Sequence, residues 1–180
     1  MGLFSKKRTT VQELVDAIAQ IGTHVSSDAN LNVYKESLRV CDLPSDITEG
    51  QKGEIFIFEL LASTHAILSA FSGSPLIGNF VLDTLHARVY SIYSTDEKAQ
   101  TDFEELLNKR FKQYRAILSS EGDMMPHLLG AEFAENFFGG EPPKSSLPFI
   151  MTSAGIFFTS MTTLKEFLDG ILLKYEIVPK

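Results

Sequence analysis

Hydrophobic residues recur every three or four positions along most of this chain, which is the spacing of one face of an α-helix. The clearest stripe consists of Phe103, Leu106, Leu107, Phe111, Tyr114 and Leu118. Another stripe, near the amino end, consists of Val11, Leu14, Val15, Ile18, Ile21 and Val25. Alternation of apolar and polar residues, which would indicate half-buried strands, is weak throughout. The pattern therefore predicts a mainly helical protein.

Start and stop signals predict where several helices lie. Three capping boxes pair Thr10 with Glu13, Thr48 with Gln51 and Ser94 with Glu97. Ser74 followed by Pro75 predicts a further start. Residues 125–138 are expected to form a helix between a cap at Asp123 and a stop at Gly139. Residues 31–40 are expected to contain a shorter helix.

The most apolar segment is residues 147–161, and a helix starting at Thr163 with Glu166 is expected to follow it. The segment is consistent with a buried helix or with a strand, because β-branched and aromatic residues are frequent in it. Its length of about 15 residues is below the roughly 20 that a membrane-spanning helix needs. The basic start of the chain is followed by no apolar run, so it does not match a secretory signal. Stable membrane anchoring is therefore not expected.

These elements predict an all-α fold, a single-domain bundle-like array of six to eight helices around a Phe-rich core. The chain of 180 residues contains fourteen Phe and no Trp, and Phe supplies large apolar area without a polar group. Residues 10–180 are expected to form this one domain. Residues 1–9 are expected to be a flexible tail.

Charge and cysteine usage narrow the class of protein. The net charge is −7, and without the basic residues Lys6, Lys7 and Arg8 it would be −7 − 3 = −10. An acidic body repels phosphate backbones, so we expect no nucleic-acid partner. One cysteine, Cys41, cannot form an internal disulfide, which favours a reducing, cytoplasmic location.

Searches for catalytic and metal-binding motifs return little. No phosphate-binding glycine loop, dinucleotide fingerprint, zinc-protease motif or nucleophile elbow occurs, and we expect no cofactor. Asp83 and His86 lie three residues apart on one predicted helix face, a partial match to the ligand spacing of helical di-metal sites. His65, His86 and His127 fall on three different predicted helices. The simpler interpretation is a hydrogen bond between Asp83 and His86 on a partly wet face, and no metal site is predicted.

Two polar residues interrupt the apolar sequence EIFIFELLASTHAILSAF, at Glu59 and His65. At 100° per residue they lie about 120° apart around the helix, so they are not expected to act as one acid–base pair. The stripe that contains Glu59 otherwise consists of small residues, which are Ala62, Ser63, Ala66, Ala70 and Gly73. A buried carboxylate needs a partner or a proton. The candidate partners are Arg88, Arg115, His86 and a tyrosine hydroxyl.

Two functions remain open on this basis, and the first is favoured. The first is a non-enzymatic interaction or regulatory module that binds a protein partner or forms a homodimer. Exposed phenylalanines in FAENFFGG would provide its surface, unless Phe133, Phe137 and Phe138 simply pack inward. The second is a small-molecule or lipid-binding pocket protein, or a metal-dependent enzyme. Its candidate ligand-binding residues are Glu59, His65, Asp83 and His86, and it requires Glu59, His65 and His86 to converge on one cavity.

Overall fold

The computed structural model describes residues 6–25, 28–93, 97–120 and 122–178. Within them the chain forms seven helices and two short strands. In chain order these are β1 (Lys7–Thr10), α1 (Val11–Val25), α2 (Asp28–Val40), α3 (Glu49–Ala70), α4 (Pro75–Tyr93), α5 (Glu97–Leu118), α6 (Met125–Phe138), α7 (Leu147–Lys174) and β2 (Tyr175–Val178). The capping serine expected at position 94 lies outside the described residues.

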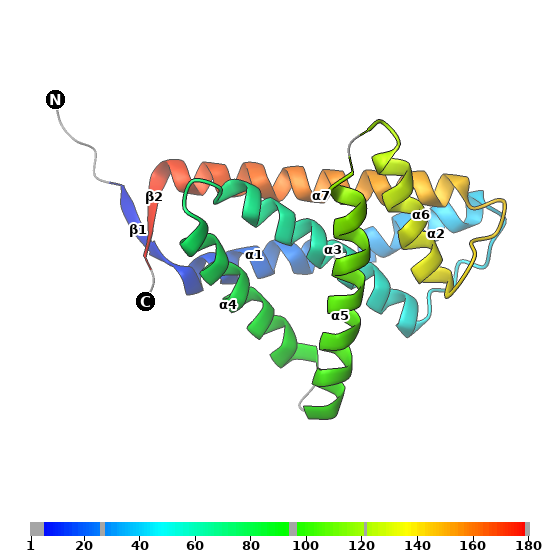
Figure 1. The fold of residues 1–180 in the computed structure, drawn as a ribbon, viewed down its shortest axis with the longest axis horizontal. Coiled ribbons are helices and arrows are strands. Elements are labelled where there is room, and N and C mark those ends of the chain that lie inside the picture. Colours follow the sequence, from blue (N-terminus) through cyan, green and yellow to red (C-terminus); the bar gives the residue numbers. More distant parts are fainter. Residues whose placement is uncertain (1–5, 26–27, 94–96, 121, 179–180) are drawn as a thin grey trace.

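The longest helix, α7, runs the length of the molecule (Figure 1). Helices α2, α3 and α6 all contact it. Helices α4 and α5 meet at an angle on one side of this layer (Figure 1). Helix α1 contacts α4. The predicted all-α array is confirmed.

Aromatic side chains from five helices form its core. The largest fully buried side chains include Tyr34, Tyr114, Phe58, Phe133, Phe149 and Phe157. The rings of Phe58 and Phe133 stack with centroids 4.4 Å apart, and Phe58 lies 5.3 Å from the ring of Tyr114. The predicted Phe-rich core is therefore confirmed.

The FAENFFGG segment packs inward rather than forming a partner surface. Phe133 and Phe137 are 0% and 3% exposed, and Phe138 is partly buried against the core. The ring of Phe137 lies 4.8 Å from that of Phe149 on α7. Helical spacing places these phenylalanines on the face that meets α7, which removes this segment as support for a partner surface.

Two predicted capping boxes are present in the structure. The backbone N–H of Thr10 donates to Glu13 Oε2 at 2.8 Å, and the Glu13 N–H donates to Thr10 Oγ1 at 3.2 Å. Thr48 and Gln51 form the same reciprocal pair at the start of α3. Each box satisfies backbone donors that a helix end leaves without a partner.

Two other predicted helix signals are wrong. No helix starts at Thr163, because the segment 147–161 is helical and continues as α7 to Lys174. The buried residues before and after Thr163, from Phe149 to Leu168, form one continuous stripe, so no break is needed. Asp123 does not cap α6, since the helix begins at Met125 and its cap position is Met124. Asp123 lies one residue too early.

The chain ends form an unexpected two-stranded sheet. Strands β1 and β2 pair in parallel, from Lys7 opposite Tyr175 to Thr10 opposite Val178. Residues 7–9 thus form a strand where a flexible tail was expected, and residues 1–5 lie outside the described part. The sequence of β1 carries no alternating apolar signal, because its burial is slight and its partner is 165 or more positions away. Backbone pairing, rather than side-chain pattern, determines this contact.

Helices α3 and α7 are both long and apolar enough to span a membrane, by length and composition alone. The sequence-based length argument missed α7 because it ended the apolar segment at Met161. In the most apolar 18-residue window, 56% of α3 is buried but only 28% of α7. Helix α3 is thus mainly a core helix, whereas most of this window of α7 is not fully buried.

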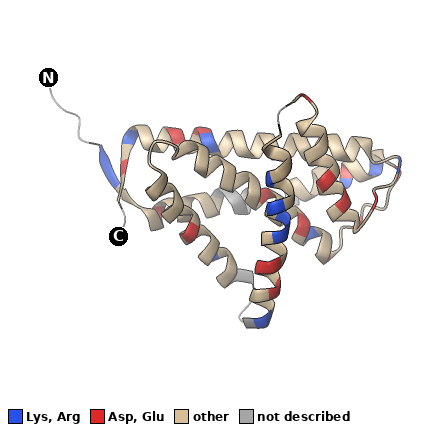
Figure 2. Ribbon diagram, in the orientation of Figure 1, with Lys and Arg blue, Asp and Glu red and all other residues tan. Residues whose placement is uncertain are grey.

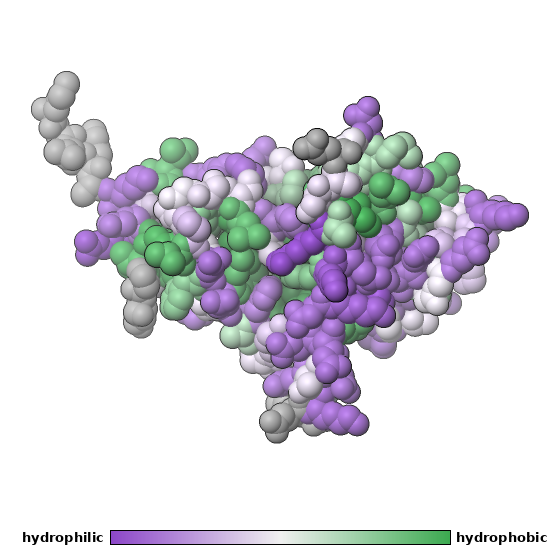
Figure 3. Space-filling view, in the orientation of Figure 1, coloured by the Kyte–Doolittle hydropathy of each residue, from purple (hydrophilic) through white to green (hydrophobic). Residues whose placement is uncertain are grey.

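Charge is distributed unevenly over the molecule. Charged residues of both signs gather along α5 (Figure 2), and the surface over α5 is correspondingly hydrophilic (Figure 3). Helix α7 carries no charged residue from Leu147 to Leu164. The exposed face of this half of α7 is therefore uncharged.

A close contact between α6 and α7 leads to a first prediction. A Cβ atom added at Gly130 would lie 2.2 Å from the backbone oxygen of Ile150. Because backbone cannot move aside cheaply, we expect Gly130→Ala to lower the free energy of unfolding by about 1–3 kcal/mol. Urea denaturation measures this change.

Gly155→Ala is the matched control for this prediction. Gly155 is an exposed glycine of α7 with nothing within 4 Å of an added Cβ. We expect this variant to be as stable as the wild type or more stable by about 0.5–1 kcal/mol, since alanine favours helix. Equal stability of the two variants would contradict the close contact at Gly130.

Candidate functional site

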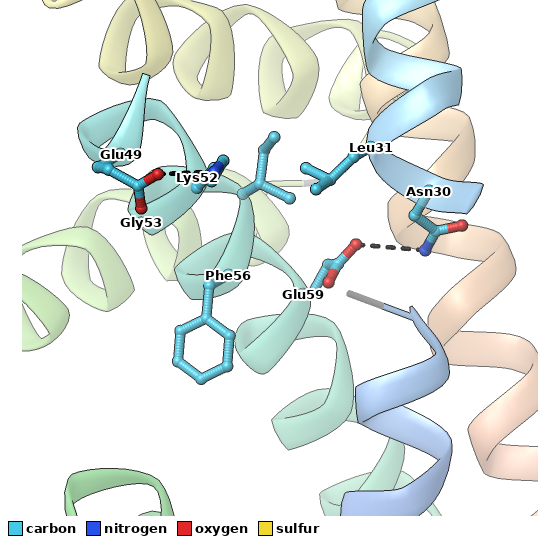
Figure 4. A pocket seen from close by; sticks show the side chains of 8 residues that line it. Asn30, Leu31, Glu49, Lys52, Gly53, Phe56 and Glu59 are labelled. Carbon is cyan, nitrogen blue, oxygen red and sulfur yellow. Dashed lines mark hydrogen bonds and ion pairs between the residues drawn. The ribbon is translucent and has the colours of Figure 1, made fainter. Parts of the chain in front are cut away.

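A hollow of about 240 Å³ opens where α2 meets the first turns of α3 (Figure 4). Its lining residues are Asn30, Leu31, Glu49, Lys52, Gly53, Ile55, Phe56 and Glu59. The α3 members recur at intervals of three or four residues, so they share one side of that helix. Because Gly53 has no side chain, the wall at that point is formed by backbone.

Glu59 is the buried polar group of this hollow and is only 7% exposed. Burial raises the pKa of its carboxyl from 4.5 to about 8, because the charged form is poorly solvated there. A hydrogen bond from Asn30 Nδ2 to Glu59 Oε1, 3.4 Å long, acts in the opposite direction. At pH 7 the carboxyl is therefore mainly protonated and neutral.

The cationic partners expected for Glu59 interact elsewhere. Arg88 pairs with Asp16 of α1, and the guanidinium of Arg115 lies 5.7 Å from the centre of the Phe111 ring. Glu59 instead contacts Asn30 on α2. The predicted arginine partners are wrong because the Glu59 carboxyl meets Asn30 of α2, whose position the sequence did not reveal.

Tyr34 is a tyrosine whose pKa is affected by the charge of Glu59. Its hydroxyl is buried and has no hydrogen-bond partner among the described residues. Burial raises the pKa of Tyr34 well above its usual value, and the charges of Glu59 and Tyr114 raise it further. The hydroxyl thus stays protonated, and it does not form the hydrogen bond that was expected of a tyrosine.

An ion pair lies at the solvent side of the hollow. Lys52 Nζ lies 2.6 Å from Glu49 Oε1, and their side chains are 44% and 89% exposed. Figure 4 shows this pair at one side of the hollow and Glu59 at the other, next to Asn30. Exposed pairs of this kind contribute little to stability.

His65 and His86 lie near Arg115 and do not line the hollow. Burial lowers the pKa of both imidazoles, and the Arg115 charge lowers each further, while Asp83 raises that of His86. Both Nε2 atoms are buried and lack a hydrogen-bond partner in the described part of the chain. Glu59 lines the hollow but His65 and His86 do not, so the pocket that requires all three residues to converge is not found, and only a site with Glu59 alone remains. The predicted angular separation of Glu59 from His65 is confirmed.

Asp83 acts on His86 through its charge and not through a hydrogen bond. Asp83 is exposed, and no hydrogen bond joins the two side chains in the described residues. The rings of His86 and Phe111 meet edge to face at 6.0 Å, so the imidazole belongs to an aromatic contact between α4 and α5. The predicted hydrogen bond is wrong because helix α5, not solvent, covers this part of α4. Among the described residues, no three His, Cys, Asp or Glu side chains are placed to hold one metal ion.

Sequence reasoning missed a buried ion pair between α3 and α5. Arg110 Nε donates to Glu54 Oε2 at 2.9 Å, and Nη2 donates to Oε1 at 2.5 Å. The Arg110 and Glu54 side chains are 12% and 11% exposed. Gln113 accepts from Arg110 and donates to Glu132 of α6 at 2.8 Å. This network joins three helices, and the acid within the apolar start of α3 was its one sequence signal.

No protein-family model, curated protein or solved structure matches this chain. The function is therefore inferred from the geometry and charge of its own residues.

Proposed function

We propose that the protein is a non-enzymatic binding protein whose small-molecule ligand occupies the hollow between α2 and α3. The buried carboxyl of Glu59 in the lining of an open hollow is the observation that supports this function most strongly. Leu31 and Ile55 offer apolar walls, and Glu59 with Asn30 offers a small polar end. Ligand sites commonly combine apolar walls with a few placed polar groups.

Binding is favoured over catalysis by the position of the histidines. A general base is most often a histidine within hydrogen-bond reach of the substrate. Here His65 and His86 lie near Arg115 on α5, away from the lining of the hollow. Among the described residues, Glu59 would therefore hold a ligand without a histidine beside it.

A fragment titration followed by two-dimensional amide NMR tests this function. Short-chain amphiphiles with four to six carbons should shift the amide signals of Leu31, Gly53 and Ile55 before others. Gly53→Met, which fills the hollow with a side chain of good helix propensity, should abolish these shifts. Gly155→Met, at an exposed glycine of α7, should preserve them. Absence of shifts, or equal shifts in both variants, would contradict the proposal.

A second candidate function is association of two copies through the exposed face of α7. Its exposed members between Leu147 and Leu164 are Leu147, Pro148, Met151, Gly155, Thr159, Thr162 and Thr163. Leu147 and Met151 are 55% and 52% exposed. A two-fold axis would place this face against itself, and an uncharged face meets no charge repulsion in that arrangement.

Sedimentation velocity tests this association. We expect a wild-type dimer at micromolar concentration and a monomer for Met151→Glu, which would place a charge in the interface. Leu173→Glu, at the other end of α7 and 77% exposed, is the matched control and should remain dimeric. A wild-type monomer at 100 micromolar would overturn this second function and leave the first untouched.

A further inference from the structure

Among the described residues, no cation pairs with Glu59. Arg110 pairs with Glu54, Lys52 with Glu49 and Arg88 with Asp16. Asn30 is the hydrogen-bond partner that Glu59 has among the described residues, and it is neutral. The carboxyl thus remains protonated because burial disfavours its charged form, and the neutral Asn30 offsets this only in part.

The hollow gives a ligand access to this carboxyl. Glu59 lines it together with Asn30 and Leu31 of α2 (Figure 4), and Ile55 of α3 adds a further apolar side chain. A carboxylate accepts about four hydrogen bonds, and Asn30 supplies one long bond. Acceptor sites therefore remain for a donor that enters through the hollow.

We infer that the hollow binds an organic ammonium ion, a primary amine on a short apolar tail, with Glu59 as its counter-ion. This inference rests on the proposed function and names its ligand class. On binding, the Glu59 carboxyl releases its proton to solvent, and the ammonium N–H groups donate to the resulting carboxylate. The apolar tail lies against Leu31 and Ile55.

An anionic ligand fits the same groups less well. A carboxylate at this position would need Lys52 to leave Glu49, and it would then lie close to the freed Glu49 charge. It would also oppose any ionisation of Glu59. A cation instead supplies the charge that the site lacks, and the ion pair at the solvent side stays intact.

The proton release makes the affinity depend on pH. Since the pKa of Glu59 is about 8, about one molecule in ten is ionised at pH 7, and each pH unit below 8 should weaken binding about tenfold. Glu49 and Lys52 of α3 also line the hollow, Tyr34 of α2 is affected by the charge of Glu59, and Tyr114 of α5 affects Tyr34 in turn. Helix α2 also carries Lys35 and the ion pair of Glu36 with Arg39. Both tyrosines stay neutral because burial raises their pKa. Helix α7 contributes no charge from Leu147 to Leu164.

Isothermal titration calorimetry with three matched probes tests the ligand class. The probes are n-pentylammonium, pentan-1-ol and pentanoate, titrated at pH 5.5, 6.5 and 7.5 in two buffers of different ionisation enthalpy. We expect n-pentylammonium to bind most tightly, about tenfold more tightly at pH 7.5 than at pH 6.5, with about one proton released at pH 6.5. Glu59→Gln and Glu59→Leu should each lose at least tenfold in affinity for n-pentylammonium, so the test holds if one of them fails to fold.

Each of the remaining outcomes would overturn the ammonium inference, and one of them would also overturn the proposed function. Equal binding of pentan-1-ol without proton release would overturn the ammonium inference and leave the proposed function standing. Preferential binding of pentanoate, with an affinity that weakens as the pH rises, would also overturn the ammonium inference and leave the proposed function standing. Binding of none of the probes to the wild type at millimolar concentration would overturn both the inference and the proposed function.

Discussion

Arg110→Met is expected to lower the free energy of unfolding by about 3–5 kcal/mol at neutral pH. The substitution leaves the carboxylate of Glu54 buried without its cation, at a side-chain exposure of 11%. It also removes the donor to Gln113, which links α5 to Glu132 of α6. Urea denaturation followed by circular dichroism measures the loss.

The double variant Glu54→Leu/Arg110→Met is the control for this result. Replacing both members of a buried ion pair with apolar residues is often neutral or stabilising, because both desolvation costs disappear. We expect the double variant to recover most of the stability lost by Arg110→Met. If the single variant lost less than about 1 kcal/mol, Glu54 and Arg110 would not form the buried pair described above.

The second large effect is a loss of stability as the pH rises, caused by Glu59. The folded protein holds a proton on this carboxyl up to a pKa of about 8, whereas the unfolded chain releases it near the ordinary value of 4.5. Between these values the folded state binds more protons, so raising the pH lowers the free energy of unfolding. The total is on the order of several kcal/mol.

Glu59→Gln isolates the contribution of Glu59 to the pH dependence of stability, because glutamine does not titrate. We expect the stability of the variant minus that of the wild type to increase steadily from about pH 4.5 to about pH 8. His65 and His86, whose pKa values are lowered, act in the opposite direction: their contribution is lost as the pH falls below the ordinary value of 6.5. They are present in both proteins and cancel in the difference. A difference that does not change with pH would show that Glu59 ionises normally.

The fold class could be predicted from local pattern because each helix carries its own signal. The stripe from Phe103 to Leu118 lies within α5, and Gly139 ends α6 in the left-handed conformation with a φ of 71°. The capping box of Thr48 and Gln51 forms as expected. These features depend on residues within one or two turns, which a sequence shows directly.

The partners of the buried polar groups could not be predicted in the same way. Glu59 was identified as a residue of interest, but its contact with Asn30 depends on how α2 packs against α3. The pair of Glu54 and Arg110 spans 56 positions, and nothing in the intervening sequence relates the two. Such contacts follow from helix arrangement, which periodicity leaves open.

The separation of Glu59 from the histidines shows an intermediate case. The helical wheel placed Glu59 and His65 on different sides of one helix, and the structure agrees. The wheel gave no information on which helix each side meets. In the structure Glu59 meets α2, and His65 lies within the field of Arg115 on α5.

The most direct test of the central claim is the ionisation of Glu59 itself. The carboxyl carbon signal, identified by its loss in Glu59→Gln, can be followed by ¹³C NMR from pH 4 to pH 9. The structure leads us to expect a midpoint of about 8, as required for a neutral acid in the hollow between α2 and α3. A midpoint near 4.5 would mean that the carboxyl is ionised and solvated at neutral pH, and it would contradict the account of this site.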